Sequence, residues 1–359
     1  MDASRPLFTY FVYAFNHEKY IREAIESAFS QTYTPLEIIL SDDCSTDNTW
    51  QIMQEMAQNY TGPNRIILNR NEKNMGISYH LNRIMQLGKG DWFVLGAGDD
   101  ISLPVRVQTI YDAIKKHPNA YGVATALINI NEGGKEIGNH NFDLKQPYLT
   151  GASSAWHRKC FEYFGEIRQS TTAEDVIIPF RSVLLGDLLL MKTPTVKYRY
   201  HEQSISNPLN MDLLTAWQHL EKIKYQLVNA CKQRLLDLEK AKPLIQPPVY
   251  EALKFEHQKL IKGFEDDIEN INLRCVIWKS ALKGKFAYLI DSNKNLPDKH
   301  HTFAYRLKTF IASFKWAQFI LKVGKSKNHH KDIEQQAENI RTINIQDLLK
   351  SDIGLLIYL

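Results

Sequence analysis

The 359-residue sequence has no apolar run long enough to span a membrane, and its first residues lack the charged-then-apolar pattern of a secretory leader. These two absences predict a cytoplasmic protein. Cysteine is scarce, and Cys44, Cys160, Cys231 and Cys275 lie far apart and form no CxxC pair. Their spacing argues against a structural zinc site and favours free thiols in a reducing compartment. The formal net charge of +4 is too small to indicate a nucleic-acid partner.

Two phosphate-binding sequences are also missing. Gly96 and Gly98 supply the first two glycines of a GxGxxG fingerprint, but Ile101 stands where the third glycine would be. Neither GxxxxGKS nor GxxxxGKT occurs anywhere in the chain. Acidic residues at the ends of strands must therefore do different work from a glycine-rich phosphate loop.

What the sequence does contain is an alternation of β-rich apolar runs and amphipathic helical patterns. Strands are predicted at 7–13, 36–40, 65–68 and 92–95, and helices at 20–32, through 52–56, at 79–87 and at 104–116. The order predicts an α/β fold with a Rossmann-like, mainly parallel central sheet flanked by helices. At this length a second domain is also expected.

Acidic residues follow two of these predicted strands. The run 91–104, DWFVLGAGDDISLP, places Asp99 and Asp100 directly after a buried strand and two glycines. Because ligands of open α/β sheets bind beyond the carboxyl ends of the strands, this carboxylate pair is a candidate site for Mg²⁺ or Mn²⁺. Asp42 and Asp43 follow the second strand in the same way. The alternative for both pairs is a polar turn that caps the next helix.

Five motifs give this pattern a specific resemblance. They lie between residues 6 and 207 and occur in the order YAFNHEKYIREAIESAFSQTYTPLEIILSDDCSTDNTW, NMGISYHLNRI, GDWFVLGAGDDISLP, TAEDVIIPFRSVLLG and VKYRYHEQSIS. Together they resemble the family 2 glycosyltransferases of the GT-A fold, of the kind that builds bacterial surface polysaccharides. The resemblance does not extend over residues 209–359.

The resemblance implies a nucleotide site around the second strand. The nucleobase role falls on Asp43, whose carboxylate could accept a hydrogen bond from N3–H of uracil, with Asp42 beside it. Tyr13, Asn16 and Asn74, which lie at the first strand and in two turns, complete the implied nucleotide-binding set.

The resemblance also implies a metal site that holds Mn²⁺ or Mg²⁺. Asp99 falls on the metal ligand, Asp100 on an assisting neighbour, and His201 on a histidine that reaches the metal or the diphosphate. Arg199 is a weaker candidate for a phosphate contact. The chain departs from the family at Ala97 and Gly98, where many members carry another aspartate that contacts ribose. This departure puts the ribose contact in doubt.

An acidic pair, Glu174 and Asp175, matches the acceptor side of the family site. Asp175 would be the general base that takes the proton of the acceptor hydroxyl, and a single displacement would invert the anomeric centre. The alternative is a pair of carboxylates at a helix start, where the helix dipole favours negative charge.

The second half of the chain has a different character. Helical patterns at 213–238 and 249–282 predict a C-terminal helical region that packs on the catalytic domain or pairs with another copy. The domain border is placed between residues 208 and 209. In 303–323, Lys308, Lys315 and Lys322 share one helical face with apolar residues on another, which predicts a basic helix at an anionic membrane surface. Packing of that helix on the protein core and nucleic-acid binding are the alternatives.

The sequence therefore predicts an inverting, metal-dependent glycosyltransferase. Its donor would be a nucleotide sugar, expected to be a UDP-sugar, and its acceptor a glycan or lipid-linked glycan at the inner face of the membrane. Two other functions remain open: a nucleotidyltransferase on a similar fold, and a non-catalytic module that binds nucleotide sugars. A nucleotidyltransferase would need a basic, glycine-rich triphosphate loop, which 13–19 is not.

Overall fold

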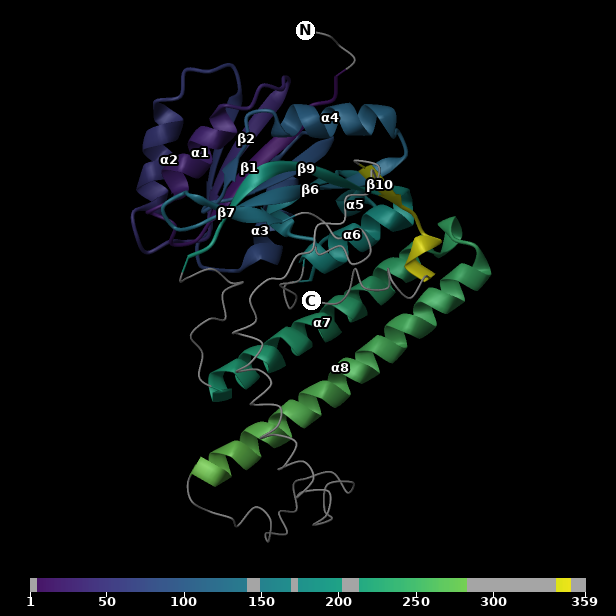
Figure 1. The fold of residues 1–359 in the computed structure, drawn as a ribbon. Helices are drawn as coiled ribbons and strands as arrows, with labels where there is room; N and C mark the ends of the chain where they lie inside the picture. Colours follow the sequence, from purple (N-terminus) through teal and green to yellow (C-terminus); the bar gives the residue numbers. More distant parts are fainter. Residues whose placement is uncertain (1–4, 141–148, 169–173, 202–212, 283–339, 350–359) are drawn as a thin grey trace, which may run out of the picture. The chain divides into compact units, whose positions relative to one another are not determined.

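The computed structural model describes residues 5–140, 149–168, 174–201, 213–282 and 340–349 (Figure 1). The chain forms two compact units, one of residues 1–204, 229–258 and 338–359 and the other of residues 205–228 and 259–337. The first unit is larger than the predicted catalytic domain of residues 1–208, because it also takes in a central piece of the helical region and a late strand.

Strands and helices alternate through the first 116 residues, where each predicted element is present. They are β1 (Phe8–Ala14), α1 (Ile21–Phe29), β2 (Leu36–Asp42), α2 (Thr49–Gln58), β3 (Arg65–Arg70), α3 (Ile77–Leu87), β4 (Trp92–Ala97), β5 (Ile101–Ser102) and α4 (Arg106–Lys116). Helix α1 shows why the pattern was readable, since Ile21, Ala24, Ile25 and Ala28 are buried at helical spacing.

The later elements are more varied. They are β6 (Ala120–Ile130), β7 (Glu136–His140), a 3₁₀ turn η1 (Gly151–Ser153), β8 (Ser154–His157), α5 (Lys159–Glu162), α6 (Glu174–Leu185), β9 (Asp187–Arg199), α7 (Leu213–Ala241), η2 (Lys242–Leu244), α8 (Pro247–Leu282), β10 (Ile340–Ile343) and η4 (Asp347–Leu349). Helices α7 and α8 confirm the two predicted long helices. Strand β10 was not predicted.

The strands form a single mixed sheet in the order β10-β9-β6-β8-β4-β1-β2-β3, with β5 beside β9 and β7 beside β6. Parallel pairing joins β3, β2, β1 and β4, and it also joins β6 to β9. Strand β8 is antiparallel to both β4 and β6, so those two groups point the same way. The predicted mainly parallel sheet is confirmed, and the carboxyl ends of β1, β2, β4 and β9 lie along one edge.

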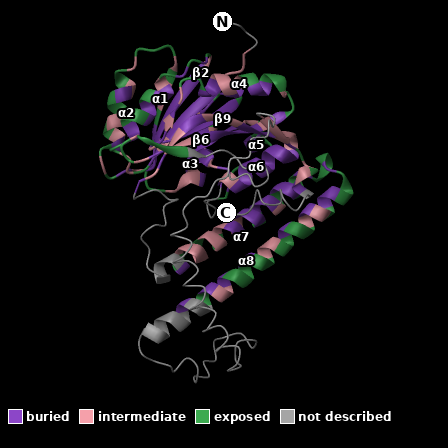
Figure 2. Cartoon of the chain, viewed as in Figure 1, coloured by how far each residue is buried: buried purple, intermediate pink, exposed green. Residues whose placement is uncertain are grey.

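Helices cover both faces of the sheet (Figure 1). On one face, Ile25 of α1, Met53 of α2 and Ile110 of α4 belong to the same buried cluster as alternate residues of β1. On the other face, Phe93 of β4 lies 6.5 Å, centroid to centroid, from Phe161 of α5. Burial is concentrated in the strands and in the inward faces of the helices (Figure 2).

Part of α7 is bound to α6 inside the first unit. The Arg181 guanidinium pairs with the Asp237 carboxylate through Nε–Oδ2 and Nη2–Oδ1 contacts of 2.7 and 3.2 Å, and both side chains are fully buried. Lys240 Nζ donates to the Phe164 carbonyl over 2.7 Å. These bonds explain why residues 229–258 belong with the sheet.

In the second unit, α7 and α8 contribute Trp217, Ile271 and Cys275 to a small apolar cluster. Lys224 Nζ lies 2.9 Å from Asp267 Oδ2. Of the helices that the structure describes, none combines the length and the hydropathy that crossing a membrane requires. The predicted basic helix at 303–323 lies outside the described residues. The four cysteines are free, as predicted.

Candidate functional site

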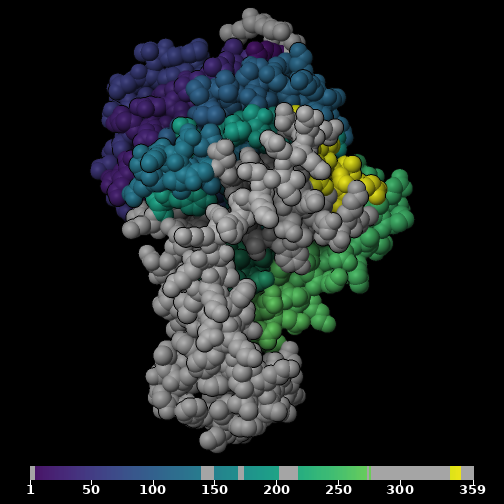
Figure 3. Space-filling model, in the orientation of Figure 1, coloured from purple at the N-terminus to yellow at the C-terminus, as the bar shows by residue number. Residues whose placement is uncertain are grey.

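The predicted site residues gather at the carboxyl edge of the sheet. Asp43 follows β2, Asp99 follows β4 and His201 follows β9, and these strands point in one direction. Strand β8 runs the opposite way, so η1, which precedes it, lies at the same edge. Segments far apart in the sequence also share the surface of this unit, where purple, blue and teal regions adjoin in Figure 3.

Asp99 lies between two imidazoles. Its Oδ2 is 3.0 Å from Nε2 of His201 and 3.9 Å from Nε2 of His17. The Tyr20 ring packs on His201 with centroids 4.8 Å apart. Burial opposes ionisation of Asp99, but the hydrogen bond with His201 and the charges of both histidines outweigh it, so the pKa of Asp99 falls below its usual value. The side chain remains 17% exposed, so a ligand can reach it.

Asp100 points away from that exposed position. Its Oδ1 accepts the Arg199 backbone N–H over 2.8 Å, and only 5% of the residue is exposed. Burial, together with the charge of Asp99, raises the pKa of Asp100 well above its usual value. A buried carboxyl group that favours its neutral form is a poor ligand for a divalent cation, so Asp100 is better suited to holding β9 against the turn that carries Asp99.

Arg199 also serves the architecture. Its Nε donates to the Asp99 carbonyl, its Nη1 to the Glu132 carbonyl and its Nη2 to Glu23, at distances from 2.6 to 2.9 Å. The guanidinium is 2% exposed and lies over the Tyr20 ring. These contacts fix the turn after β4, and they leave the guanidinium badly placed for the predicted phosphate contact.

Asp43 organises the loop after β3. Its Oδ1 accepts hydrogen bonds from Asn71 Nδ2 and the Met75 N–H, at 2.8 and 3.0 Å, and its Oδ2 accepts one from the Gly76 N–H at 2.8 Å. Gly76 has φ +80 and precedes α3, which is a backbone shape that suits glycine. A carboxylate oxygen can accept two hydrogen bonds, so Oδ2 retains capacity for a nucleobase N–H.

The other predicted nucleotide-binding residues support this loop. Asp42 is fully buried, and its Oδ2 accepts from Arg70 Nε and the Ser45 N–H, so it acts from beneath the surface. The Asn16 side chain accepts the Thr46 N–H over 2.8 Å. Asn74 is exposed in the turn before α3.

Tyr13 lies beneath the convergence of these acids. Burial raises the pKa of its phenol well above the usual value, and the charges of Glu174, Asp99 and Asp100 raise it further. Tyr13 therefore stays neutral and able to donate a hydrogen bond. The same electrostatic contacts show that residues 99, 100 and 174, which are distant in sequence, surround one position.

Helix α6 begins at this edge with Glu174 and Asp175. Glu174 is 6% exposed, and a methyl group at position 151 would come within 2.9 Å of its Oε1, so Gly151 makes room for it. Burial and then the charge of Asp175 raise the pKa of Glu174 well above its usual value. Asp175 is partly exposed, and burial raises its pKa to about 6.

The carboxylate of Asp99 and the imidazole of His201 are suitable donors for a divalent cation. Within the described residues, no three His, Cys, Asp or Glu side chains are arranged to hold an ion by themselves. Such a cation would need further oxygen ligands, and a diphosphate is a common source of them. Asp99 and His201 therefore fit a cation that is shared with a phosphorylated ligand.

Sequence reasoning missed His17, Tyr20 and Gly151. His17 and Tyr20 follow β1 in a stretch interpreted as a turn and the start of a helix, and only the strand-end position could have drawn attention to them. Gly151 lies in a small-residue loop whose neighbour could not be read from the sequence.

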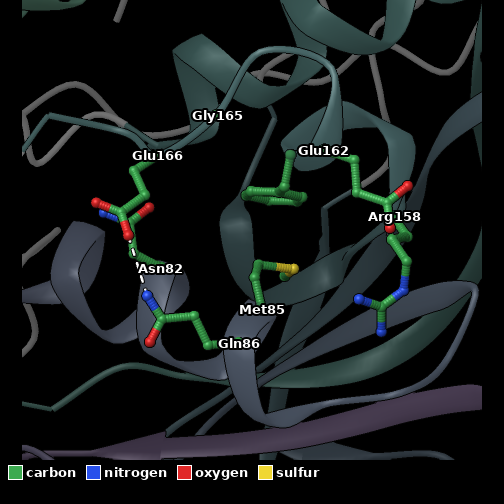
Figure 4. Close-up of a pocket in the computed structure, with 8 residues that line it drawn as sticks. Asn82, Met85, Gln86, Arg158, Glu162, Gly165 and Glu166 are labelled. Atoms are coloured by element: carbon green, nitrogen blue, oxygen red, sulfur yellow. Dashed lines mark hydrogen bonds between the residues drawn. The ribbon is translucent and has the colours of Figure 1, made fainter.

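A separate pocket in the first unit contains none of the predicted site residues (Figure 4). Its lining comes from α3, α5 and the segment after α5: Asn82, Met85, Gln86, Arg158, Phe161, Glu162, Gly165 and Glu166. Arg158 there donates to the carbonyls of Gly88 and Gly90, which precede β4. The pocket is therefore at the amino end of that strand, opposite to the edge that carries the acids.

Comparison with known proteins gives this edge a context. Residues 9–179 match the family model described as Glycosyl transferase family 2. The putative glycosyltransferase EpsE of Bacillus subtilis is 34% identical over 120 residues, which cover 33% of this chain and 42% of that protein. A chondroitin synthase of Escherichia coli is 33% identical over 158 residues, which cover 44% of this chain and 22% of that protein. The chain thus spans less than half the length of these relatives.

One solved structure supports the fold. The crystal structure of S. aureus TarS residues 1–349, in complex with UDP-GlcNAc, aligns with a TM-score of 0.51 over 88% of this chain and 92% of that chain. Sequence identity is 16%, so the likeness concerns the fold alone.

Proposed function

Since residues 9–179 belong to glycosyl transferase family 2, we propose that this protein transfers a sugar from a UDP-sugar to a hydroxyl group of a glycan or lipid-linked glycan. The observation that carries the proposal is the convergence of three groups at one sheet edge: the Asp43 loop, the Asp99–His201 pair, and the acids at the start of α6. They correspond to a nucleobase contact, a cation site and an acceptor-side base.

In this proposal Asp43 recognises the base. Its Oδ2 has capacity for N3–H of uracil, while its other bonds hold the loop of residues 71–76 in place. Asp42 and Asn16 stabilise the neighbouring loop, and Tyr13 forms the floor. Because these supports are present without ligand, little ordering is required when the donor binds.

Asp99 and His201 would hold a divalent cation together with the donor's diphosphate. When bound, the cation would act as a Lewis acid that stabilises the leaving nucleoside diphosphate. The low pKa of Asp99 keeps that carboxylate ionised at neutral pH, which is the form that binds a cation.

Asp175 would remove the proton from the acceptor hydroxyl as that oxygen attacks the anomeric carbon. Its pKa of about 6 allows it to be ionised at neutral pH and still be a stronger base than an ordinary aspartate. A single base on the acceptor side supports a single displacement, so the product's anomeric configuration should be inverted. Glu174, which is more buried, would stay protonated and shape the site.

The direct test is donor hydrolysis. The purified protein would be screened against UDP-sugars and GDP-sugars with Mn²⁺, with thermal stability as the first readout, because a ligand that binds only the folded state raises its stability. Slow release of UDP from one donor, lost in Asp99→Asn, would support the proposal. UDP binding without any release under these conditions would favour a non-catalytic module. Release of pyrophosphate from a nucleoside triphosphate would favour a nucleotidyltransferase.

A further inference from the structure

We infer that His17 is a third protein ligand of the cation at Asp99, and that it makes the site favour Mn²⁺ and other first-row transition ions over Mg²⁺. This inference deepens the proposed function and rests on it for the presence of a cation.

The two imidazoles face the same oxygen atom. Nε2 of His201 and Nε2 of His17 lie 3.0 and 3.9 Å from Asp99 Oδ2, and the two rings are nearly perpendicular with centroids 6.4 Å apart. The His17 contact is too long for a hydrogen bond. Two ligands that share an octahedral ion at about 2.1 Å lie about 3.0 Å apart when adjacent and about 4.2 Å apart when opposite. Both observed distances fall in that range.

The backbone fixes His17 in front of Asp99. Its N–H donates to Thr49 Oγ1 over 2.8 Å, and its carbonyl accepts the N–H groups of Tyr20 and Ile21 at the start of α1. Position 98 leaves room for the ring, since a Cβ on Gly98 would come within 2.8 Å of His17 Nδ1. A larger residue at position 98 would push the imidazole away. The side chain is 19% exposed, which leaves it open to the site.

The charge state of His17 suits a metal ligand. Burial lowers the pKa of its imidazole, against the opposing effect of the Asp99 charge, so the ring favours the neutral form that can donate a lone pair. Asp99, His17 and His201 come from three different loops and leave one side open. Diphosphate oxygens would occupy that side, which explains why the three groups do not enclose an ion by themselves.

Two nitrogen ligands change which ion is preferred. Mg²⁺ favours oxygen ligands in near-ideal octahedral geometry and gives up water reluctantly. Transition ions bind imidazole more readily, in the order of increasing affinity from Mn²⁺ to Cu²⁺. A site with one carboxylate and two imidazoles should therefore bind Mn²⁺ or Co²⁺ more tightly than Mg²⁺.

The test is a titration of the full chain with MnCl₂, with and without UDP, followed by electron paramagnetic resonance of the free ion. Mg²⁺ affinity is measured by competition. In His17→Ala, Mn²⁺ affinity should fall at least about tenfold, a loss at least as large as that for perturbing a ligand's support, and Mg²⁺ affinity should fall less. His17→Glu should retain an ion and shift the preference toward Mg²⁺. His117→Ala removes an imidazole at the end of α4, outside this group, and should change neither affinity.

Circular dichroism and thermal melting would check that each variant folds. If Mn²⁺ affinity is unchanged in His17→Ala but lost in Asp99→Asn, the inference is overturned while the cation site of the proposed function survives. Equal losses of Mn²⁺ and Mg²⁺ affinity in His17→Ala would also overturn it, because His17 would then act only through the shape of the loop. Sugar transfer that persists in a chelator would count against the cation in the proposed function, whatever the titrations show.

Discussion

At the scale of single residues, the two acids at the start of α6 share a sequence position but not an environment. Glu174 is buried against Gly151, and its charge reaches Tyr13. Asp175 is partly exposed, with a pKa raised to about 6. Two carboxyl groups with different surroundings can take different roles in one reaction, and here only Asp175 combines access with ionisation at neutral pH.

Asp175→Asn should therefore abolish most of the transfer activity and preserve donor binding. The change keeps the side-chain shape and removes the proton acceptor, and loss of a positioned base costs roughly 10²–10⁴-fold in rate. Glu174→Gln is the matched control and should cost less, because Glu174 favours its neutral form already. Transfer rates and UDP affinity of both variants would be compared. A Glu174→Gln enzyme that loses more activity than Asp175→Asn would move the base to Glu174.

The rate should also depend on pH in a defined direction. Asp175 accepts a proton only when ionised, so kcat/KM should rise as the pH increases through about 6 and then level off. The same raised pKa means that the folded state binds this proton more tightly than the unfolded state does, so folding stability falls as pH rises from about 4 to about 6. A kcat/KM profile without this limb in the wild type, or with the same limb in Asp175→Asn, would show that another group titrates.

At the scale of elements, α6 connects the candidate site to α7. The Arg181–Asp237 pair is buried, and Arg181 also donates to the carbonyls of Gly165 and Cys160. Sequence patterns located both helices, but no local signal pairs an arginine with an aspartate 56 positions later. The piece of α7 that joins the first unit could therefore not be separated from the rest of the helical region by sequence alone.

Arg181→Met should destabilise the fold strongly, because it leaves the Asp237 charge buried without its partner, at a cost of about 3–5 kcal/mol. Arg181→Met/Asp237→Leu should recover much of that loss, since removing both charges also removes the desolvation penalty. Arg22→Ala is the control, because the Arg22–Glu55 pair is half exposed and such pairs contribute about 0–1 kcal/mol. Urea denaturation would measure the three free energies of unfolding. A double variant no more stable than Arg181→Met would show that the Gly165 and Cys160 contacts dominate.

At the scale of the whole molecule, the basic pattern at 303–323 remains a prediction from sequence. Strand β10 restricts how it can be tested, because Ile340–Ile343 pairs with β9 and a deletion through the C-terminus would remove a strand of the sheet. Substitution of the lysines leaves that strand in place and is the cleaner experiment.

Lys308→Gln/Lys315→Gln/Lys322→Gln should weaken binding to vesicles that contain anionic lipid. Each basic residue near such a surface contributes about 1 kcal/mol, so three neutralised lysines should lower the partition constant on the order of a hundredfold. Lys115→Gln/Lys116→Gln/Lys135→Gln makes the same charge change at exposed positions of the first unit and should have little effect. Co-sedimentation at two salt concentrations would measure both. Equal weakening by the two triple variants would indicate a general charge effect and no specific helix.

The sequence by itself determined the elements of the first unit and the edge at which chemistry should occur. The spacing of apolar residues is a local property, so Ile21 to Ala28 predict α1 and Trp92 to Leu95 predict β4 without knowledge of their neighbours. Parallel strands then bring their carboxyl ends together, which was enough to expect Asp43, Asp99 and His201 at one edge. The tertiary structure alone decided where each side chain points. Asp100 turns inward because the Arg199 backbone needs an acceptor, and His17 faces Asp99 because Gly98 leaves room for its ring. Such choices depend on contacts between residues far apart in the chain, and no local pattern encodes them.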